Sequence, residues 1–371
     1  MFTPPLARDA GMQARPGSSS RGWRRPVIIV LLAAAVLACA CVAAVGEIAA
    51  APVPRAARIA ALAAKVDPCL ADVTATLGTG QGRVEGTGIV LTSTGEVLTN
   101  NHVIEDATSI MVTDVGNGRG YQAVVVGYDR KHDIAVLQLR GASGLKAVTL
   151  DGSRTLKVGQ AVVALGNADG KGGTPVIATG TITGLDRAVT AFDWATGMSG
   201  QLTGVIASNA GIAAGDSGGA LVSTDGRVVG VNAAGALGSR FPSVTQAHAY
   251  SIPASQAASI ASQIEAGRAS ATVHIGATAF LGVTIMLSGI AGFQYADAVV
   301  TAVMADSPAA AAGLTAGDVI TSLGAHTIAS ASDVQNLVWQ YHPGERISIG
   351  WTDRAGQPRT ATVQLTSGPA G

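Results

Sequence analysis

The amino-acid sequence predicts a mostly β protein built from short strands. Runs of Val, Ile, Leu and Thr recur from about residue 71, and turn signals such as Asn117-Gly118 and Asp225-Gly226 separate them. Aromatic residues make up 4% of the chain and charged residues 13%, while glycine occurs 48 times. This composition suits short-stranded β architecture more than a helical bundle. Many short strands without long helical segments between them indicate a barrel or a sandwich.

The expected strands follow one another closely along the chain. They are predicted at residues 73–77, 86–91, 97–99, 109–112, 122–128, 134–139, 160–166, 174–185, 205–208, 220–222 and 228–233. A helix is predicted over residues 254–266, because Ile260 and Ile264 are spaced i, i+4 and Gly267 follows as a stop signal. We expect this helix to pack on the last strands and close the domain.

The N-terminal region predicts a membrane anchor. Residues 1–25 are rich in Pro, Ser and Arg without apolar periodicity, which indicates a disordered cytoplasmic tail. Residues 27–46 form an uncharged run of 20 residues, and at about 1.5 Å per residue such a helix spans roughly 30 Å of hydrocarbon. We therefore expect a transmembrane helix over residues 26–47. Arginines on its N-terminal flank keep that side cytoplasmic, so the following residues are expected to be extracytoplasmic.

Two other interpretations of the apolar run remain open. The small residues at 49–51 fit a signal-peptide cleavage site, which would release a secreted protein. The segment Val36-Leu37-Ala38-Cys39 resembles a lipoprotein cleavage box, which would leave a lipid anchor. Residues 48–70 are rich in Ala and are predicted to be a linker that leads into a short helix.

Charge and cysteine usage argue against several classes of partner and cofactor. The chain has 24 basic and 24 acidic residues, and no basic cluster follows residue 25, so no nucleic-acid partner is expected. Cys39 and Cys41 lie in the apolar run and leave Cys69 alone beyond it, so no disulfide is expected there. The six histidines are scattered without metal-ligand spacing. We expect neither a metal nor another cofactor.

A glycine-rich pentapeptide is the first candidate for chemistry. Gly215-Asp216-Ser217-Gly218-Gly219 places a serine on a turn whose backbone amides can converge on one point. N–H groups aimed at the oxygen of an attacked carbonyl stabilise its developing charge by roughly 2.7 to 4 kcal/mol per donor. Gly215 and Ser217 would supply these donors, and Asp216 between them completes the predicted oxyanion hole. An ordinary glycine-rich hairpin turn is the alternative interpretation.

A serine nucleophile needs a base and an orienting carboxylate. His102 follows the run Val97-Leu98-Thr99-Asn100-Asn101, and Asp133 precedes the apolar strand at 134–139. The predicted triad is therefore His102, Asp133 and Ser217 in chain order. His132 is an alternative base that we expect to face solvent, and Asp106 and Asp129 are alternative carboxylates.

These three motifs resemble those of the trypsin-like serine proteases, and within them the HtrA/DegP type. The signatures of that family look like TNxHV, DxAVL and GxSGG, and a PDZ domain follows them. The similarity covers roughly residues 71–366 and looks closest to secreted mycobacterial members. It implies a protease domain over residues 71–266, with two six-stranded antiparallel β-barrels in the chymotrypsin-like arrangement. The active site would lie between the barrels, with His102 and Asp133 from the first and Ser217 from the second.

The segment before the nucleophile departs from the family pattern. Related sequences commonly look like Thr-Asp-Ala-Ala-Ile-Asn-Pro-Gly-Asn here, whereas this chain has Ser-Asn-Ala-Gly-Ile-Ala-Ala-Gly-Asp at residues 208–216. The proline is lost and Gly211 is added, so we expect a looser loop. In this family the loop switches between ordered and collapsed forms, which bears directly on basal activity.

A PDZ domain is expected over residues 273–368, after a linker at 267–272. Phe280-Leu281-Gly282-Val283 resembles a carboxylate-binding loop, and an amphipathic helix is predicted from about Ser332 to Tyr341. Three consecutive amides in such a loop can hold a C-terminal carboxylate while the peptide adds a strand beside the next one. The alternative for Phe280 and Leu281 is simple core packing.

Taken with the resemblance, the residues predict a membrane-tethered extracytoplasmic serine endopeptidase. Its expected substrates are unfolded or signalling proteins, in quality control or regulated proteolysis, and the PDZ domain would bind C-terminal peptides. A homotrimer is one assembly that the resemblance implies. The alternative function is an inactive protease-fold chaperone or peptide-binding protein. An α/β-hydrolase does not fit, because its nucleophile precedes the acid and the histidine in the chain.

We predict that cleavage follows small to medium aliphatic residues. In trypsin-like folds the floor of the pocket for this side chain lies about six residues before the nucleophile, which is Gly211 here. The walls would be Ile212 and, on the facing strand, Ala233, Ala234 and Gly235. A buried Lys or Arg would lose its hydration without gaining a partner, whereas each buried methylene of an aliphatic side chain contributes about 0.8 kcal/mol. Proteomic mapping of cleavage sites should show Val, Ala, Leu or Ile before the cut, and a dominance of Lys or Arg would place the pocket elsewhere.

Overall fold

The structure is a computed structural model that describes residues 54–78, 82–152, 155–167, 170–192, 199–233, 249–286 and 298–370. The expected tail at 1–25 and the expected transmembrane helix at 26–47 lie outside the described residues, as do Ala234 and Gly235. Across the described ranges, every helix is too short or too polar to cross a bilayer. The membrane anchor therefore stays a prediction.

A helix occupies most of the described part of the expected linker at 48–70. Helix α2 (Arg55–Val66) buries Leu62, Ala63 and Val66 on one face, and its basic residues are exposed. A short 3-10 turn, η1 (Asp67–Cys69), leads from it into the first strand. Cys69 is buried, and burial raises the pKa of its thiol.

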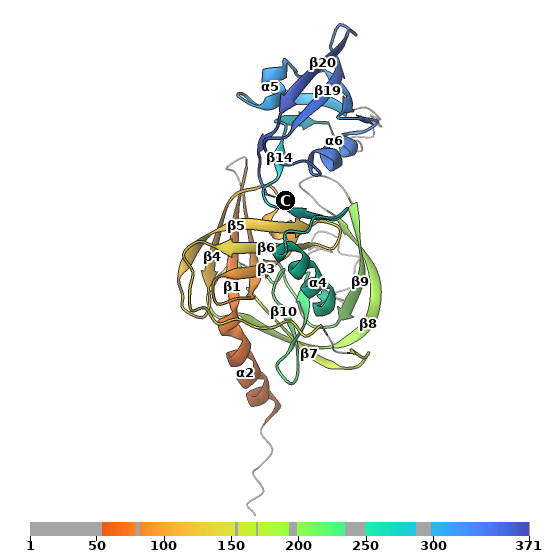
Figure 1. Cartoon of the computed structure of the whole chain (residues 1–371). Helices are drawn as coiled ribbons and strands as arrows, with labels where there is room; N and C mark the ends of the chain where they lie inside the picture. Colours follow the sequence, from red (N-terminus) through yellow and green to blue (C-terminus); the bar gives the residue numbers. More distant parts are fainter. Residues whose placement is uncertain are drawn as a thin grey trace, which may run out of the picture. The chain divides into compact units, whose positions relative to one another are not determined.

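The first six strands close into an antiparallel barrel (Figure 1). The order around the ring is β1-β2-β3-β6-β5-β4, and the pairing of β5 with β6 closes it. Each of these strands overlaps one that the sequence predicts. Their bounds are β1 (Leu70–Leu77), β2 (Arg83–Val90), β3 (Glu96–Thr99), β4 (Ala107–Asp114), β5 (Gly120–Asp129) and β6 (Ile134–Leu139).

A second closed barrel follows, with the strand order β10-β11-β12-β9-β8-β7. Five of its strands overlap predicted ones, and the sequence analysis missed the sixth, β12. Their bounds are β7 (Ala161–Gly166), β8 (Val176–Phe192), β9 (Ser199–Ser208), β10 (Ala220–Ser223), β11 (Val228–Asn232) and β12 (Ala249–Pro253). The predicted pair of six-stranded antiparallel barrels is confirmed.

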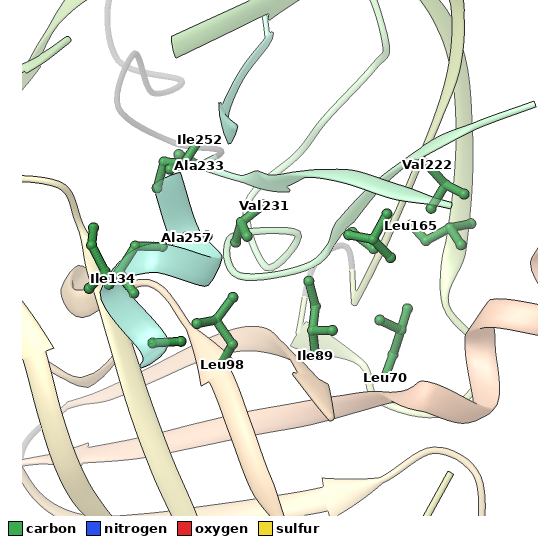
Figure 2. Close-up of a cluster of buried hydrophobic side chains, with 14 of the residues drawn as sticks. Leu70, Ile89, Leu98, Ile134, Leu165, Val222, Val231, Ala233, Ile252 and Ala257 are labelled. Atoms are coloured by element: carbon green, nitrogen blue, oxygen red, sulfur yellow. The ribbon is translucent and has the colours of Figure 1, made fainter. Parts of the chain in front are cut away.

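One apolar cluster joins the two barrels. Figure 2 shows side chains of the first barrel, such as Leu98 and Ile134, gathered with Val231 and Ile252 of the second. Helix α4 (Ala254–Glu265) contributes Ala257 to the same cluster. Ile260 and Ile264, whose i, i+4 spacing predicts this helix, lie on the face that it buries. The helix packs against both barrels and not only the second.

The boundary predicted at residue 273 falls inside the sheet of the first barrel. Strand β13 (Val273–Ile275) pairs antiparallel with β5, so that Val273 lies opposite Asp129. The chain then forms a separate five-stranded path, β15-β16-β17-β19-β20, around a core that contains Leu323, Ile349 and Trp351. The bounds of this region are β14 (Ala279–Phe280), β15 (Val283–Ile285), β16 (Ala298–Val303), α5 (Pro308–Ala312), β17 (Val319–Leu323), β18 (His326–Thr327), α6 (Ala331–Val338), β19 (Arg346–Thr352), β20 (Pro358–Gln364) and β21 (Thr366–Ser367).

Leu98→Ala should destabilise the fold strongly, because Leu98 is fully buried in the cluster that joins the barrels. Removing a buried leucine side chain costs about 2 to 5 kcal/mol of unfolding free energy. The matched control is Met111→Ala on β4, whose side chain is 43% exposed and whose loss should cost less than about 0.5 kcal/mol. Urea denaturation of the purified chain measures both values, and equal values would contradict this description of the core.

Candidate active site

His102 lies on a single helical turn that the end of β3 leads into. Helix α3 (Asn101–Ile104) begins after Asn100, whose backbone is extended. Val103 and Ile104 are buried and fix the turn against the first barrel, whereas the side chain of His102 is 43% exposed. The apolar residues thus anchor the turn, and the imidazole stays accessible.

Asp133 holds His102 through both of its carboxylate oxygens. The Nδ1 atom of His102 lies 2.8 Å from Oδ2, and the backbone N–H of His102 donates to Oδ1 at 3.0 Å. A carboxylate at this position accepts, so the Nδ1–H tautomer is favoured and Nε2 is left to act as a base. Asp133 itself adopts a left-handed conformation, with φ 54°, at the mouth of β6. Asn100 supports it by donating from Nδ2 to the Asp133 carbonyl at 2.8 Å.

The backbone of Ser217 lies directly against β2 of the first barrel. The N–H of Thr87 donates to the Ser217 carbonyl at 2.8 Å. A Cβ placed on Gly86 would lie 2.6 Å from Val103, beside His102, and 3.2 Å from the Ser217 carbonyl oxygen. The turns that carry His102 and Ser217 therefore meet at the same point of β2.

Glycine is required after Ser217 because the two barrels approach closely there. Gly218 has φ 85°, and a Cβ on it would lie 2.0 Å from the Thr87 carbonyl oxygen. Glycine tolerates both this positive φ and the close backbone approach, because it has no Cβ.

The oxyanion loop, residues 213–217, is held from inside by Asp216. The Asp216 carboxylate is buried, and its Oδ2 accepts from the Ala213 N–H at 2.8 Å. The Asp216 N–H in turn donates to the Ala213 carbonyl at 3.1 Å. Because the Asp216 N–H is engaged within the loop, it is not free to bind a substrate oxygen. The proposed oxyanion hole therefore uses the N–H groups of Gly215 and Ser217. Within the described residues the Gly215 N–H donates to no backbone acceptor.

The alternative base, His132, has its own carboxylate partner. Its Nδ1 lies 2.8 Å from Asp129 Oδ2, and its backbone N–H donates to Asp129 Oδ1 at 3.0 Å. Thr272 also donates to Asp129 Oδ2, at 2.8 Å. The expectation that His132 faces solvent is wrong, because its side chain is only 24% exposed. The pair closes the turn between β5 and β6, which explains its geometry without a catalytic role.

The predicted pocket residues remain predictions. Gly211 has open space where a Cβ would project, and Ile212 is partly buried. Ala233 belongs to the buried cluster that joins the barrels (Figure 2). Across the described ranges, no three His, Cys, Asp or Glu side chains are placed to hold a metal ion.

Two carbonyls of the loop at residues 280–283 accept hydrogen bonds from the start of α5 and the segment before it. The Leu281 carbonyl accepts from the Ala309 N–H at 2.9 Å, and the Gly282 carbonyl accepts from the Met304 N–H at 2.9 Å. Gly282 has φ 82°, and a Cβ on it would lie 2.1 Å from Ser307 Cβ. With its carbonyls turned inward, the loop can present amides to an anion. Leu281 is also a buried core residue, which agrees with core packing at that position, and the carboxylate-binding role of the loop stays a prediction.

Two supporting residues escaped the sequence analysis. Thr87 contacts the oxyanion loop from β2, and Asn100 supports Asp133. Thr87 stands between Gly86 and Gly88, directly before the apolar end of the strand. A polar residue flanked by two glycines is the sequence signal that could have indicated its role. Asn100 stood inside the quoted motif, but nothing in the sequence indicates which carbonyl its amide would reach.

Two closed barrels that share a His–Asp pair and a serine turn define the class of trypsin-like peptidases. Residues 86–231 match the trypsin-like peptidase domain family, and residues 254–365 match the PDZ domain family. The chain belongs to the HtrA type of serine proteases, which combines these two domains.

The relatives agree on this family. The serine protease PepD of Mycobacterium tuberculosis is 34% identical over 325 residues, which cover 83% of this chain and 66% of PepD. The periplasmic serine endoprotease DegP of Salmonella typhimurium is 34% identical over 292 residues, which cover 76% of this chain and 56% of DegP. The chain thus spans about half to two thirds of the length of the curated relatives it matches. The solved structure of the HtrA-type protease AlgW with tripeptide is 28% identical, with a TM-score of 0.48, and covers 84% of this chain and 98% of that chain.

His102→Ala should abolish peptide hydrolysis, because no other group would be positioned to take the proton of Ser217. His132→Ala is the matched control, since both histidines bind a carboxylate through Nδ1 at 2.8 Å. It should leave turnover within about twofold of the wild type, because a histidine in a turn contributes to local order only. Steady-state kinetics on one peptide substrate compares the two, and the opposite pattern would show that the base has been assigned wrongly.

Proposed function

We propose that the protein is an extracytoplasmic serine endopeptidase in which Ser217 is the nucleophile, His102 the general base and Asp133 the orienting carboxylate. The observation that carries this proposal is the pair of hydrogen bonds between Asp133 and His102, beside the turn that contains Ser217. The relatives support it, since they are named as serine proteases and endoproteases.

Each side chain has a defined task in hydrolysis. His102 Nε2 takes the hydroxyl proton as Ser217 Oγ attacks the carbonyl carbon, and Asp133 stabilises the imidazolium that forms. The amides of Gly215 and Ser217 stabilise the charge on the carbonyl oxygen. His102 then gives its proton to the leaving amine, which leaves an acyl group on Ser217. A water molecule, deprotonated by the same histidine, hydrolyses this acyl-enzyme and restores the free serine.

The PDZ domain would recruit substrates, or gate the protease activity, by binding C-terminal peptides. Val283 and Ile285 of β15 and Leu337 of α6 are partly buried against the core of this domain, so apolar surface remains available beside β15. A peptide can add a strand to β15 while its carboxylate binds the amides of residues 280–283. Unfolded or signalling proteins in quality control or regulated proteolysis fit this arrangement.

The proposed location is the outer side of a membrane, with a helix over residues 26–47 as a single anchor. The support is the uncharged run at 27–46 with arginines before it, together with the name of DegP as a periplasmic enzyme. A homotrimer is the assembly that we propose by analogy with related enzymes. Membrane fractionation of expressing cells tests the anchor: the full-length chain should stay with membranes after a high-salt wash.

Degradation of casein by the wild type and by Ser217→Ala tests the activity. The substitution removes the nucleophile, and the account predicts a loss of at least about 1,000-fold in kcat, as for other serine enzymes of this type. Equal turnover by the two proteins would refute the serine mechanism. Turnover by neither, with retained binding of unfolded casein, would favour the alternative of an inactive chaperone or peptide-binding protein.

A further inference from the structure

We propose that Thr87 is a positioning residue whose hydroxyl holds the oxyanion loop in the conformation needed for hydrolysis. This inference rests on the proposed function, because it assigns a task to a side chain beside Ser217. Thr87 lies in the middle of β2 on the first barrel, whereas the loop belongs to the second. The hydroxyl therefore acts across the boundary between the barrels.

The Thr87 hydroxyl makes two hydrogen bonds in a buried position. It donates to the Gly215 carbonyl at 2.7 Å and accepts from the Asn167 N–H at 2.8 Å. Thr87 is only 1% exposed, so water cannot replace either bond. One hydroxyl thus satisfies a carbonyl of the oxyanion loop and an amide at the end of β7.

Together with a second hydrogen bond, the bond to Gly215 fixes the orientation of one peptide group of the loop. The plane between Gly215 and Asp216 carries the Gly215 carbonyl, which Thr87 binds, and the Asp216 N–H, which binds the Ala213 carbonyl. The two amides proposed for the oxyanion hole, at Gly215 and Ser217, flank this plane. Holding the plane therefore limits the directions that these two amides can take.

The loop needs such an external tether because its own sequence gives it freedom. Gly215 has φ 91°, and Gly211 precedes it without contacts at its Cβ position. A glycine loses more conformational freedom on ordering than any other residue. Within residues 213–216, the contacts between Ala213 and Asp216 also restrain the loop, but none of the hydrogen bonds between these two residues involves the Gly215 carbonyl that Thr87 binds.

The same hydroxyl connects the loop to the segment that follows β7. Asn167 accepts from the Gly172 N–H through its Oδ1 at 2.7 Å, and the next residue, Gly173, donates to Asp72 Oδ2 on β1 at 3.0 Å. The backbone of Thr87 is fixed independently, since its carbonyl accepts from Thr99 Oγ1 at 2.7 Å and its N–H binds Ser217. Loss of the side-chain hydroxyl alone would thus leave β2 in place.

Thr87→Val, Thr87→Ser and Thr278→Val test the proposal in the full chain. Valine keeps the shape of threonine and removes the hydroxyl, whereas serine keeps the hydroxyl. Thr278→Val is the matched control, because Thr278 is also buried and its hydroxyl makes one hydrogen bond, to Tyr128 at 3.2 Å. Measurements are kcat and KM on a short peptide, the pH profile of kcat, and hydrogen exchange of residues 213–218 by mass spectrometry.

For Thr87→Val we expect kcat to fall roughly 10-fold to 100-fold with KM within about twofold, because the amides act on the transition state. The midpoint of the pH profile should stay unchanged, since His102 and Asp133 are untouched. Exchange of residues 213–218 should quicken. Thr87→Ser should restore kcat to within about threefold of the wild type, and Thr278→Val should match the wild type in all three measurements.

Three results would overturn the proposal. They are an unchanged kcat in a folded Thr87→Val, a loss in Thr87→Ser as large as that in Thr87→Val, or an equal loss in Thr278→Val. Failure of the proposed function is distinguishable, because it would show as equal turnover by the wild type and Ser217→Ala. In that case hydrogen exchange still decides whether Thr87 holds the loop: quickened exchange in Thr87→Val supports it, and unchanged exchange refutes it.

Discussion

The close approach of β2 to the Ser217 turn is the constraint on which the rest of this structure depends. A Cβ on Gly218 would lie 2.0 Å from the Thr87 carbonyl oxygen, and one on Gly86 would lie 3.2 Å from the Ser217 carbonyl oxygen. Two glycines on opposite barrels therefore remove the side chains that would keep the barrels apart. Because the proposed triad is divided between the barrels, this contact would decide whether His102 can reach Ser217.

Several polar side chains buried at this contact form hydrogen bonds with nearby backbone groups. Thr87 and Thr99 on the first barrel and Asp216 on the second are almost fully buried, and each bonds to backbone that surrounds the serine. Unsatisfied, such groups would each cost about 1 to 3 kcal/mol. The network thus specifies one arrangement of the loop at the place where the chemistry needs it. The left-handed backbone of Asp133 adds local strain of the kind that proteins retain at functional sites.

The sequence predicts the barrels well because their strands carry plain apolar patterns between turn signals. Residues 134–139 are observed as β6 with the predicted bounds, and helix α4 covers all but the last residue of its predicted range. Strand β12 was missed because it runs directly into the helix and ends in Pro253, which is the N-cap of α4. The pairing of β13 with β5 could not be predicted, since the partners lie more than 140 positions apart and nothing local encodes the register.

The His–Asp pair could be predicted from the sequence, whereas the residues that support it could not. His102 and Asp133 stand in motifs that resemble a known family, whereas the roles of Thr87 and Asn100 depend on which distant carbonyl their side chains reach. His132 shows the same limit, because its pairing with Asp129 depends on how the turn after β5 folds. Local sequence thus predicts which groups would react, and only the fold reveals what holds them.

Labelling with a fluorophosphonate tests the central claim most directly, namely that the two barrels assemble one activated serine. The reagent forms a phosphorus–oxygen bond to an activated hydroxyl and loses fluoride, so intact mass and peptide mapping report both extent and position. The account predicts one adduct per chain, on Ser217, and its loss in His102→Ala. A folded chain that forms no adduct, or forms one at another residue, would contradict the account.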